Sequence, residues 1–281
     1  DARKSRGLGD VYKRQDNPSG NHINYGVREF GMSAIMNGMV LHGGIKPYGA
    51  TFLVFTDYAR NAVRLSALMG LPNIFVYTHD SVALGEDGPT HQPIEHMVTL
   101  RSTPNLNNWR PADLVETAVA WKNAVSSTKT PTCLIFSRQG TSPINRTSDQ
   151  LNAIKMGGYL LKVNDSPDLT IIASGSELQL ALDASIELEN DSINANVVSM
   201  PSLDIFLEQS EEFQNTIIDS SKPVLVVECG HPNSWYKILN RSDKVIGIES
   251  FGESAPGNVL LEHFGFTIEN VVGTAKSLIN D

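Results

Sequence analysis

Residues 50–80 read ATFLVFTDYARNAVRLSALMGLPNIFVYTHD, and the order of patterns in this stretch decides the fold class. A β-branched and aromatic run, residues 50–55, precedes a helical pattern that starts near Thr56 or Asp57 as N-cap. A second apolar run follows at residues 73–78. A strand, a helix and a strand in this order predict a crossover unit with parallel strands. The predicted helix carries its small apolar residues on one face: Ala59, Val63 and Ala67.

The same alternation continues on both sides of a polar, turn-rich segment, GTSPINRTS, at residues 140–148. Before it, the sequence predicts a strand at TCLIFS, residues 132–137, and a helix from RPADLVETAVAW with Pro111 in its first turn. After it, we predict strands at LTIIAS, NANVVSM, PVLVVE and KVIGIE, and helices at about residues 176–189 and through IENVVGTAKSLI. The fold class is therefore α/β, with two consecutive domains that each have a mostly parallel sheet flanked by helices.

The first fifteen residues, DARKSRGLGDVYKRQ, differ from the rest in composition, and DVYKRQ resembles the translation of an adapter from DNA sequencing libraries. We expect residues 1–15 to be an adapter or assembly scar and exclude them. Their removal takes away five cationic and two acidic side chains, so the net charge changes from -9 to -12. This acidic balance argues against a nucleic-acid partner.

No apolar run approaches the roughly 18 residues that a membrane span needs, and we therefore expect no membrane partner. Cys133 and Cys229 each lie at one end of an apolar run, in TPTCLIF and PVLVVEC. Two such cysteines suit buried thiols in a reducing compartment better than a disulfide framework. We expect a cytoplasmic protein.

Polar residues follow the predicted strands of the first domain. His79 and Asp80 come after NIFVYT, Asp87 and His91 lie in the next loop, LGEDGPTHQP, and Arg138 comes after TCLIFS. Because ligands gather at the carboxyl ends of parallel strands, we expect these groups to converge on one crevice. Imidazoles can exchange protons with hydroxyl and carbonyl oxygens, and a guanidinium can hold a phosphate. Taken singly, His79 and His91 are ordinary loop histidines, and the spacing of twelve residues between them matches no common metal motif.

Glu29 lies where a predicted helix begins, in NYGVREFGMSAIMNGMVLHGG, residues 24–44. Taken alone, it is a first-turn acid that complements the helix dipole. The aromatic residues Phe52, Phe55 and Tyr58, taken alone, are core residues. Together, the acid and the rings could form a slot for a flat heterocycle, whose faces stack and whose ring nitrogen hydrogen-bonds the carboxyl group.

Several motifs resemble transketolase, in the order that the family has them: YGVREFGM, TFLVFTDYARNAVR, YTHDSVALGEDGPTHQPIEH, NWRPAD and SRQ. ESFGESAPGNVLLEHFGF resembles the end of the family's C-terminal domain, so the resemblance runs from about Asn21 to the end. Transketolases use thiamine diphosphate to move a two-carbon ketol unit from a ketose phosphate to an aldose phosphate. The resemblance implies a pyrimidine-binding domain that lacks its start at residues 16–140, a linker at residues 141–154 and a C-terminal domain at residues 155–281.

For the cofactor, the resemblance implies that Glu29 is catalytic and hydrogen-bonds the ring nitrogen of the aminopyrimidine, to which it passes a proton. This chemistry requires a carboxyl pKa above its ordinary value, and we expect desolvation by neighbouring apolar groups to raise the pKa. Phe52, Phe55 and Tyr58 are implied to form the aminopyrimidine slot, with Phe55 stacking directly on the ring.

For the substrate, the resemblance implies that His79 and Arg138 bind the sugar phosphate. Asp87 is implied to contact a hydroxyl group near the reacting carbon, and His91 to position and protonate the substrate oxygen as a second catalytic residue. The implied pathway is the pentose phosphate pathway, with the Calvin cycle as a further setting.

The family's metal motif, Gly-Asp-Gly followed by Asn, belongs to its N-terminal domain, and no GDG occurs in this sequence. We therefore assign no metal ligand here and expect Mg²⁺ or another divalent cation to be bound by a domain outside this chain. Because the family's cofactor lies between two subunits, we expect a homodimer and an isolated chain without activity. Dihydroxyacetone synthase, deoxyxylulose-phosphate synthase, the β-subunits of 2-oxo acid dehydrogenases and a non-catalytic dimerisation module remain as alternatives.

Overall fold

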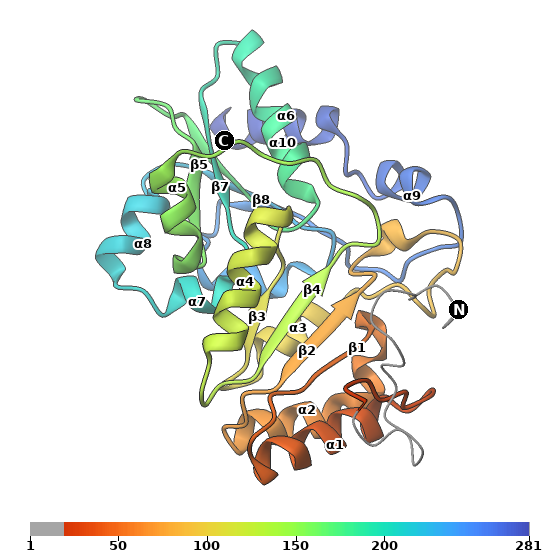
Figure 1. The fold of residues 1–281 in the computed structure, drawn as a ribbon. Coiled ribbons are helices and arrows are strands. Elements are labelled where there is room, and N and C mark those ends of the chain that lie inside the picture. The colour runs from red at the N-terminus through yellow and green to blue at the C-terminus, as the bar shows by residue number, and fades with distance from the viewer. Residues whose placement is uncertain (1–19, 281) are drawn as a thin grey trace.

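The computed structural model describes residues 20–280, and the predicted scar at residues 1–15 lies outside this range. Two sheets with helices on their faces form adjacent α/β units, which confirms the predicted fold class (Figure 1). Both cysteines are buried free thiols, as predicted. Among the described helices, none has the length and apolar character needed to cross a membrane.

The first sheet has four parallel strands in the order β1-β2-β4-β3. Its register aligns the last residues of three neighbouring strands, Phe52, Thr78 and Phe136. The segments that leave these strands therefore start at one edge of the sheet. The strands are β1 (Tyr48–Phe52), β2 (Ile74–Thr78), β3 (Asn107–Trp109) and β4 (Thr132–Phe136).

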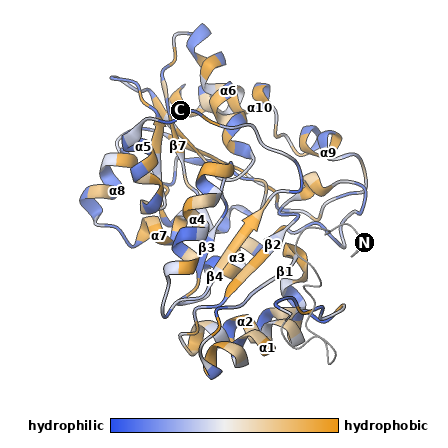
Figure 2. Ribbon diagram, viewed as in Figure 1, coloured by the Kyte–Doolittle hydropathy of each residue, from blue (hydrophilic) through white to orange (hydrophobic). Residues whose placement is uncertain are grey.

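Side chains of this sheet pack on both faces, as a parallel sheet requires. Phe75 and Tyr77 face one core, with Met32 and Met36, whereas Ile74 faces the other. Figure 2 shows β2 and β4 as hydrophobic strands. The helical elements of this unit are α1 (Glu29–His42), η1 (Leu53–Phe55), α2 (Thr56–Leu68), η2 (Val82–Leu84), α3 (His96–Arg101) and α4 (Leu114–Ser126).

The second sheet has the order β5-β7-β6-β8-β9, in which β5 alone is antiparallel to its neighbour. Its strands are β5 (Tyr159–Lys162), β6 (Leu169–Ala173), β7 (Ala195–Ser199), β8 (Val224–Val227) and β9 (Lys244–Ile246). The accompanying helical elements are α5 (Ser148–Ala153), η3 (Ile154–Met156), α6 (Glu177–Asn190), α7 (Leu203–Leu207), α8 (Glu211–Ile217), η4 (Pro232–Lys237), α9 (Gly257–His263) and α10 (Ile268–Asn280).

Some predicted boundaries were wrong. The predicted first strand extends to Phe55, but the backbone turns into η1 after Phe52. Thr56 is the first residue of α2 and not its N-cap. The helix predicted to contain Pro111 starts only at Leu114, because the Asp113 carboxylate caps it by accepting from two backbone N–H groups. The short strands β3 and β5 were not predicted.

Buried ion pairs connect the two units. The Arg101 guanidinium donates from Nη1 and Nη2 to the two Glu228 carboxylate oxygens, both at 2.7 Å, and all these groups are buried. The Arg110 guanidinium contacts Asp80 in the first unit at 2.8 Å and also pairs with Glu177 in the second. An interface with buried, paired charges fixes the orientation of one unit on the other, since an unpaired charge there is costly.

Candidate active site

The carboxyl ends of β1, β2 and β4 carry the predicted site residues. Phe52 ends β1, His79 directly follows β2, and Arg138 follows β4 by two residues. Because the register holds these ends level, the topology brings together residues that are up to 86 positions apart in the sequence. This juxtaposition matches the edge at which open parallel sheets bind ligands.

Aromatic rings form a continuous array at this edge. The ring of His79 stacks on Phe52 with centroids 3.6 Å apart, and Phe52 stacks on Phe55 at 5.9 Å. Phe55 also contacts Tyr58 at 5.8 Å and meets His91 edge-on at 5.5 Å. Tyr58 is 66% exposed, so one end of the array is open. Three predicted cofactor residues and both predicted imidazoles therefore belong to one cluster.

The two imidazoles are oriented in the same manner. His79 Nδ1 lies 2.8 Å from Thr78 Oγ1, and His91 Nδ1 lies 2.8 Å from Thr90 Oγ1. Within the described part of the chain, the structure records no hydrogen bond at either Nε2 atom. A neighbouring hydroxyl that engages Nδ1 fixes the ring and leaves Nε2 to face a ligand.

His79 also has an unusual backbone, with a φ of +60°. Such a conformation costs a non-glycine residue on the order of 1 kcal/mol and requires support from its surroundings. The next residue, Asp80, is buried and receives a hydrogen bond of 2.9 Å from Arg110 Nε. This buried pair holds the chain in place immediately after His79.

Charges converge on His79. Partial burial lowers the pKa of its imidazole, the Arg138 guanidinium lowers it further, and the carboxylates of Asp87 and Asp80 act in the opposite direction. The influence of Arg138 and Asp87 shows that both lie within electrostatic range of the ring. Asp87 and Arg138 are exposed, so a ligand at this edge can reach both.

Glu29 is the first residue of α1 and is half-buried. Met32 and Met36 pack on Gly49, whereas Met39 lies with Ile45 near the start of β1, so α1 runs antiparallel to that strand. The start of α1 therefore lies toward the carboxyl end of β1. Among the described residues, no hydrogen bond or ion pair from the Glu29 carboxylate is recorded.

The predicted apolar surroundings of Glu29 are only partly present. Phe30 is 51% exposed, whereas Met32 is buried. The Phe30 ring is therefore itself in contact with water, unlike the buried apolar neighbour that was predicted for the Glu29 carboxyl. The structure brings the rings, the imidazoles and the charges of Asp87 and Arg138 together, and it places Glu29 at the same end of β1 without a recorded contact to them.

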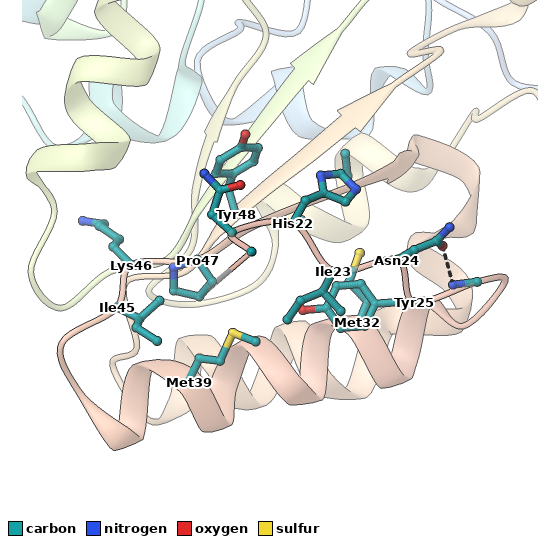
Figure 3. Close-up of a pocket in the computed structure, with 15 residues that line it drawn as sticks. His22, Ile23, Asn24, Tyr25, Met32, Met39, Ile45, Lys46, Pro47 and Tyr48 are labelled. Atoms are coloured by element: carbon teal, nitrogen blue, oxygen red, sulfur yellow. Dashed lines mark hydrogen bonds between the residues drawn. The ribbon is translucent and has the colours of Figure 1, made fainter. Parts of the chain in front are cut away.

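A cavity of about 750 Å³ lies along α1, beside the residues that lead into β1 and the first residues of that strand (Figure 3). Its walls come from the segment before α1, from α1 itself and from the residues that lead into β1, among them Tyr25, Met39, Ile45 and Tyr48. None of the predicted site residues lines it. Its volume alone does not make it a site, because its recorded lining contains no convergent acid and base.

The supporting roles of two residues in the site region were not predicted. Asp80 is predicted only as one of the polar groups at the crevice, and Gln92 has no predicted role. Both side chains are buried beside candidate site residues, His79 and His91. In the sequence, each is a polar residue in a loop that has no helical or strand periodicity. Such a loop gives no indication of whether a polar side chain is buried and supports its neighbours or is exposed and binds a ligand.

Within residues 20–280, no three His, Cys, Asp or Glu side chains form a cluster able to hold a metal ion. The aromatic array, the Nε2 atoms and the exposed guanidinium can instead hold a flat ring and an anionic, hydroxylated ligand. The fold and the site thus define a two-domain α/β protein with an aromatic, histidine-containing site at strand ends.

Comparisons with known proteins identify the family. The family model for the transketolase pyrimidine-binding domain matches residues 1–143, and that for the transketolase-like C-terminal domain matches residues 157–267. The chain belongs to the transketolase family, whose members depend on thiamine diphosphate.

Transketolase 1 of Vibrio parahaemolyticus is 54% identical over 263 residues, which is 93% of this chain and 40% of the relative. Transketolase 2 of Pasteurella multocida is 51% identical over 269 residues, with coverages of 94% and 40%. The chain thus spans about two-fifths of the length of these curated relatives.

Two solved structures are informative. The Pichia stipitis transketolase in complex with sedoheptulose 7-phosphate has a TM-score of 0.92 at 42% identity, and the match covers 97% of this chain and 40% of that one. A split-gene transketolase, described as an inactive β4 tetramer, has a TM-score of 0.74 at 26% identity, with coverages of 92% and 84%.

Proposed function

We propose that this chain forms the aminopyrimidine-side wall and the sugar-phosphate site of a transketolase, which transfers a two-carbon ketol unit from a ketose phosphate to an aldose phosphate. One observation carries the proposal: the rings of His79, Phe52, Phe55 and His91 form one array at the strand ends, with Asp87 and Arg138 in electrostatic range of His79. Aromatic rings can stack on a flat heterocycle, and a guanidinium can hold the phosphate of an anionic sugar.

The residues present fit the aminopyrimidine half of thiamine diphosphate. When bound, thiamine diphosphate supplies the carbon that takes up and releases the ketol unit. Phe55 and Tyr58 offer ring faces at the open end of the array, and Phe52 backs them. The Glu29 carboxyl, without a recorded partner of its own among the described residues, is available to hydrogen-bond a ring nitrogen and to hold or pass a proton there.

The substrate assignments use the atoms left available around His79. Arg138 and His79 Nε2 hold the phosphate, for which an exposed guanidinium is well suited. The Asp87 carboxylate accepts from a hydroxyl group of the sugar. His91 Nε2 moves a proton to or from the substrate oxygen, because its Nδ1 is already engaged by Thr90.

Among the described residues, no cluster of His, Cys, Asp or Glu side chains fits the Mg²⁺ that accompanies the diphosphate. We assign the diphosphate and the Mg²⁺ to a segment of a complete transketolase outside this chain and derive no step through the metal. In the same proposal, residues 16–140 and 155–281 are the pyrimidine-binding and C-terminal domains, joined by residues 141–154. The protein acts in the cytoplasm, in the pentose phosphate pathway, as a homodimer.

An isolated chain of this span is proposed to be inactive. The match to the split-gene transketolase covers 84% of that protein's chain, and that protein is described as an inactive tetramer. This description supports the proposal that the isolated chain is inactive.

A chimera tests the function. The 263-residue segment that this chain matches in Vibrio parahaemolyticus transketolase 1 is replaced by the corresponding residues of this chain. We expect ketol transfer from xylulose 5-phosphate to ribose 5-phosphate that depends on thiamine diphosphate and Mg²⁺. The unmodified Vibrio enzyme is the control for assembly. A folded chimera that binds the cofactor and transfers no ketol unit would contradict the proposal.

A further inference from the structure

We propose that residues 252–257 of the second unit, the bracing loop, position residues 79–92 of the first unit, the substrate loop. This inference deepens the proposed function and rests on it for its catalytic consequence. The substrate loop carries His79, Asp87 and His91. The bracing loop contacts no ligand in this proposal, and its residues are positioning residues.

The substrate loop has little regular structure of its own. Its backbone hydrogen bonds join residues three apart, from Gly85 N to Val82 O, from Gly88 N to Gly85 O and from His91 N to Gly88 O. Apart from the single turn of η2, it is a succession of turns. Such a segment holds candidate catalytic groups in place only when another part of the protein packs on it.

Gln92 connects the two loops. Its buried side-chain Nε2 donates to Gly85 O at 2.8 Å, within the substrate loop, and to Glu253 O at 2.9 Å, in the bracing loop. These carbonyl acceptors fix which end of the amide carries the nitrogen. Because Gln92 directly follows His91, a shift of the bracing loop is transmitted to the imidazole through one peptide unit.

The bracing loop approaches the substrate loop closely at glycine residues, where a side chain would meet an atom of the other loop. A Cβ atom on Gly257 would lie 2.4 Å from the backbone oxygen of Ala83, and one on Gly252 would lie 1.8 Å from Gln92 Oε1. On the other side, a Cβ on Gly88 would lie 2.2 Å from Ser254 Oγ. Gly88 adjoins Asp87 in the sequence. The two loops therefore pack closely beside candidate substrate residues, backbone against backbone at Gly257 and backbone against side chain at Gly252 and Gly88.

Further contacts hold both ends of the substrate loop against the second unit. At its start, Asp80 pairs with Arg110, which in turn pairs with Glu177. Val82 is fully buried in the hydrophobic core of the second unit. After its end, Ile94 O accepts from His231 N at 3.0 Å. Contacts with the second unit thus hold the substrate loop in position at both of its ends.

Hydrogen exchange in the 281-residue chain tests the contact directly. Gly257→Ala adds one methyl group at the contact with Ala83, whereas the control Gly273→Ala adds one on α10, where a Cβ meets nothing within 4 Å. We expect Gly257→Ala to speed amide exchange at Gly85, Gly88 and His91 by about tenfold or more. Gly273→Ala should leave this exchange unchanged.

Gln92→Met provides a second variant, because it keeps the side-chain length and removes both donors. It should speed exchange at the same amides, which keeps the test decisive if Gly257→Ala does not fold. Unchanged exchange in the substrate loop of folded Gln92→Met, or the same change in the Gly273→Ala control, would overturn the proposal.

Kinetics of the chimera test the catalytic consequence. Gly257→Ala and Gln92→Met should lower kcat/KM for xylulose 5-phosphate by about tenfold or more, with the Kd of thiamine diphosphate within about twofold of its parent. A parallel loss of cofactor affinity would indicate general damage and contradict a positioning role. A parent chimera without activity would count against the proposed function alone, since the exchange experiment does not depend on it.

Discussion

The substitution Glu228→Gln tests the buried connection between the two units. The Glu228 carboxylate is 2% exposed and accepts from Arg101, Ser174 Oγ and Trp235 Nε1. Burial opposes its ionisation, but the charges of Arg101 and Arg110 and the hydrogen bonds from Arg101 and Ser174 outweigh this effect and lower its pKa from 4.5 to about 2. The difference corresponds to about 3 kcal/mol of stability at pH 7, since one pH unit is worth about 1.4 kcal/mol.

The sign of the pH dependence follows from the direction of this shift. A carboxyl group whose pKa is lower in the folded state stabilises the protein above its unfolded pKa, here 4.5, and loses that contribution as the pH falls toward about 2. Glu228→Gln removes the charge at every pH. The difference in unfolding free energy between wild type and variant should therefore fall from about 3 kcal/mol at pH 7 to about 1 kcal/mol at pH 3.

Equilibrium urea unfolding of both proteins at the two pH values measures this difference. Glu177→Gln, which also removes a buried carboxylate beside Arg110, controls for the loss of any charge at the interface. A Glu228→Gln variant as stable as wild type at pH 7, or a difference that does not shrink at pH 3, would refute the reasoning.

Three further predictions concern the site. In the chimera, Arg138→Ala should raise KM for phosphorylated sugars by a factor worth about 1.5–3 kcal/mol and leave KM for unphosphorylated analogues nearly unchanged. An equal rise in KM for both kinds of sugar would contradict the assignment of Arg138 to the phosphate. In the isolated chain, the same substitution should raise the pKa of His79 toward its ordinary value, as followed by NMR, because Arg138 now lowers it; no change would place Arg138 elsewhere. The isolated chain should be folded, should self-associate and should show neither tight thiamine diphosphate binding by calorimetry nor ketol transfer, and micromolar binding with transfer would contradict this.

The sequence predicted those features that a local pattern determines. The parallel strands were found because buried strands such as residues 74–78 are apolar without interruption and stand next to a helical period. The strand-end location of His79 and Arg138 followed from the general geometry of parallel sheets. The family resemblance supplied the roles, because ring stacking and proton transfer leave no periodic pattern.

Other features depend on contacts between distant residues. The strand β3 has three residues, and its place at the edge of the first sheet is decided by pairing with β4. Gln92 bonds Glu253 across 161 positions of sequence, and Arg101 pairs with Glu228 across 127. No local sequence pattern predicts partners that are so distant in the sequence. The positive φ of His79 was likewise unpredictable, since histidine has no general preference for that region strong enough to reveal it.

The proton-relay role of Glu29 is the central claim, and the substitution Glu29→Gln in the chimera tests it most directly. The amide can still hydrogen-bond an aminopyrimidine ring nitrogen but cannot pass it a proton. We predict that kcat for ketol transfer falls by about 100-fold or more, while calorimetry gives a Kd for thiamine diphosphate within about threefold of the parent. Near-normal turnover in this variant would contradict the account.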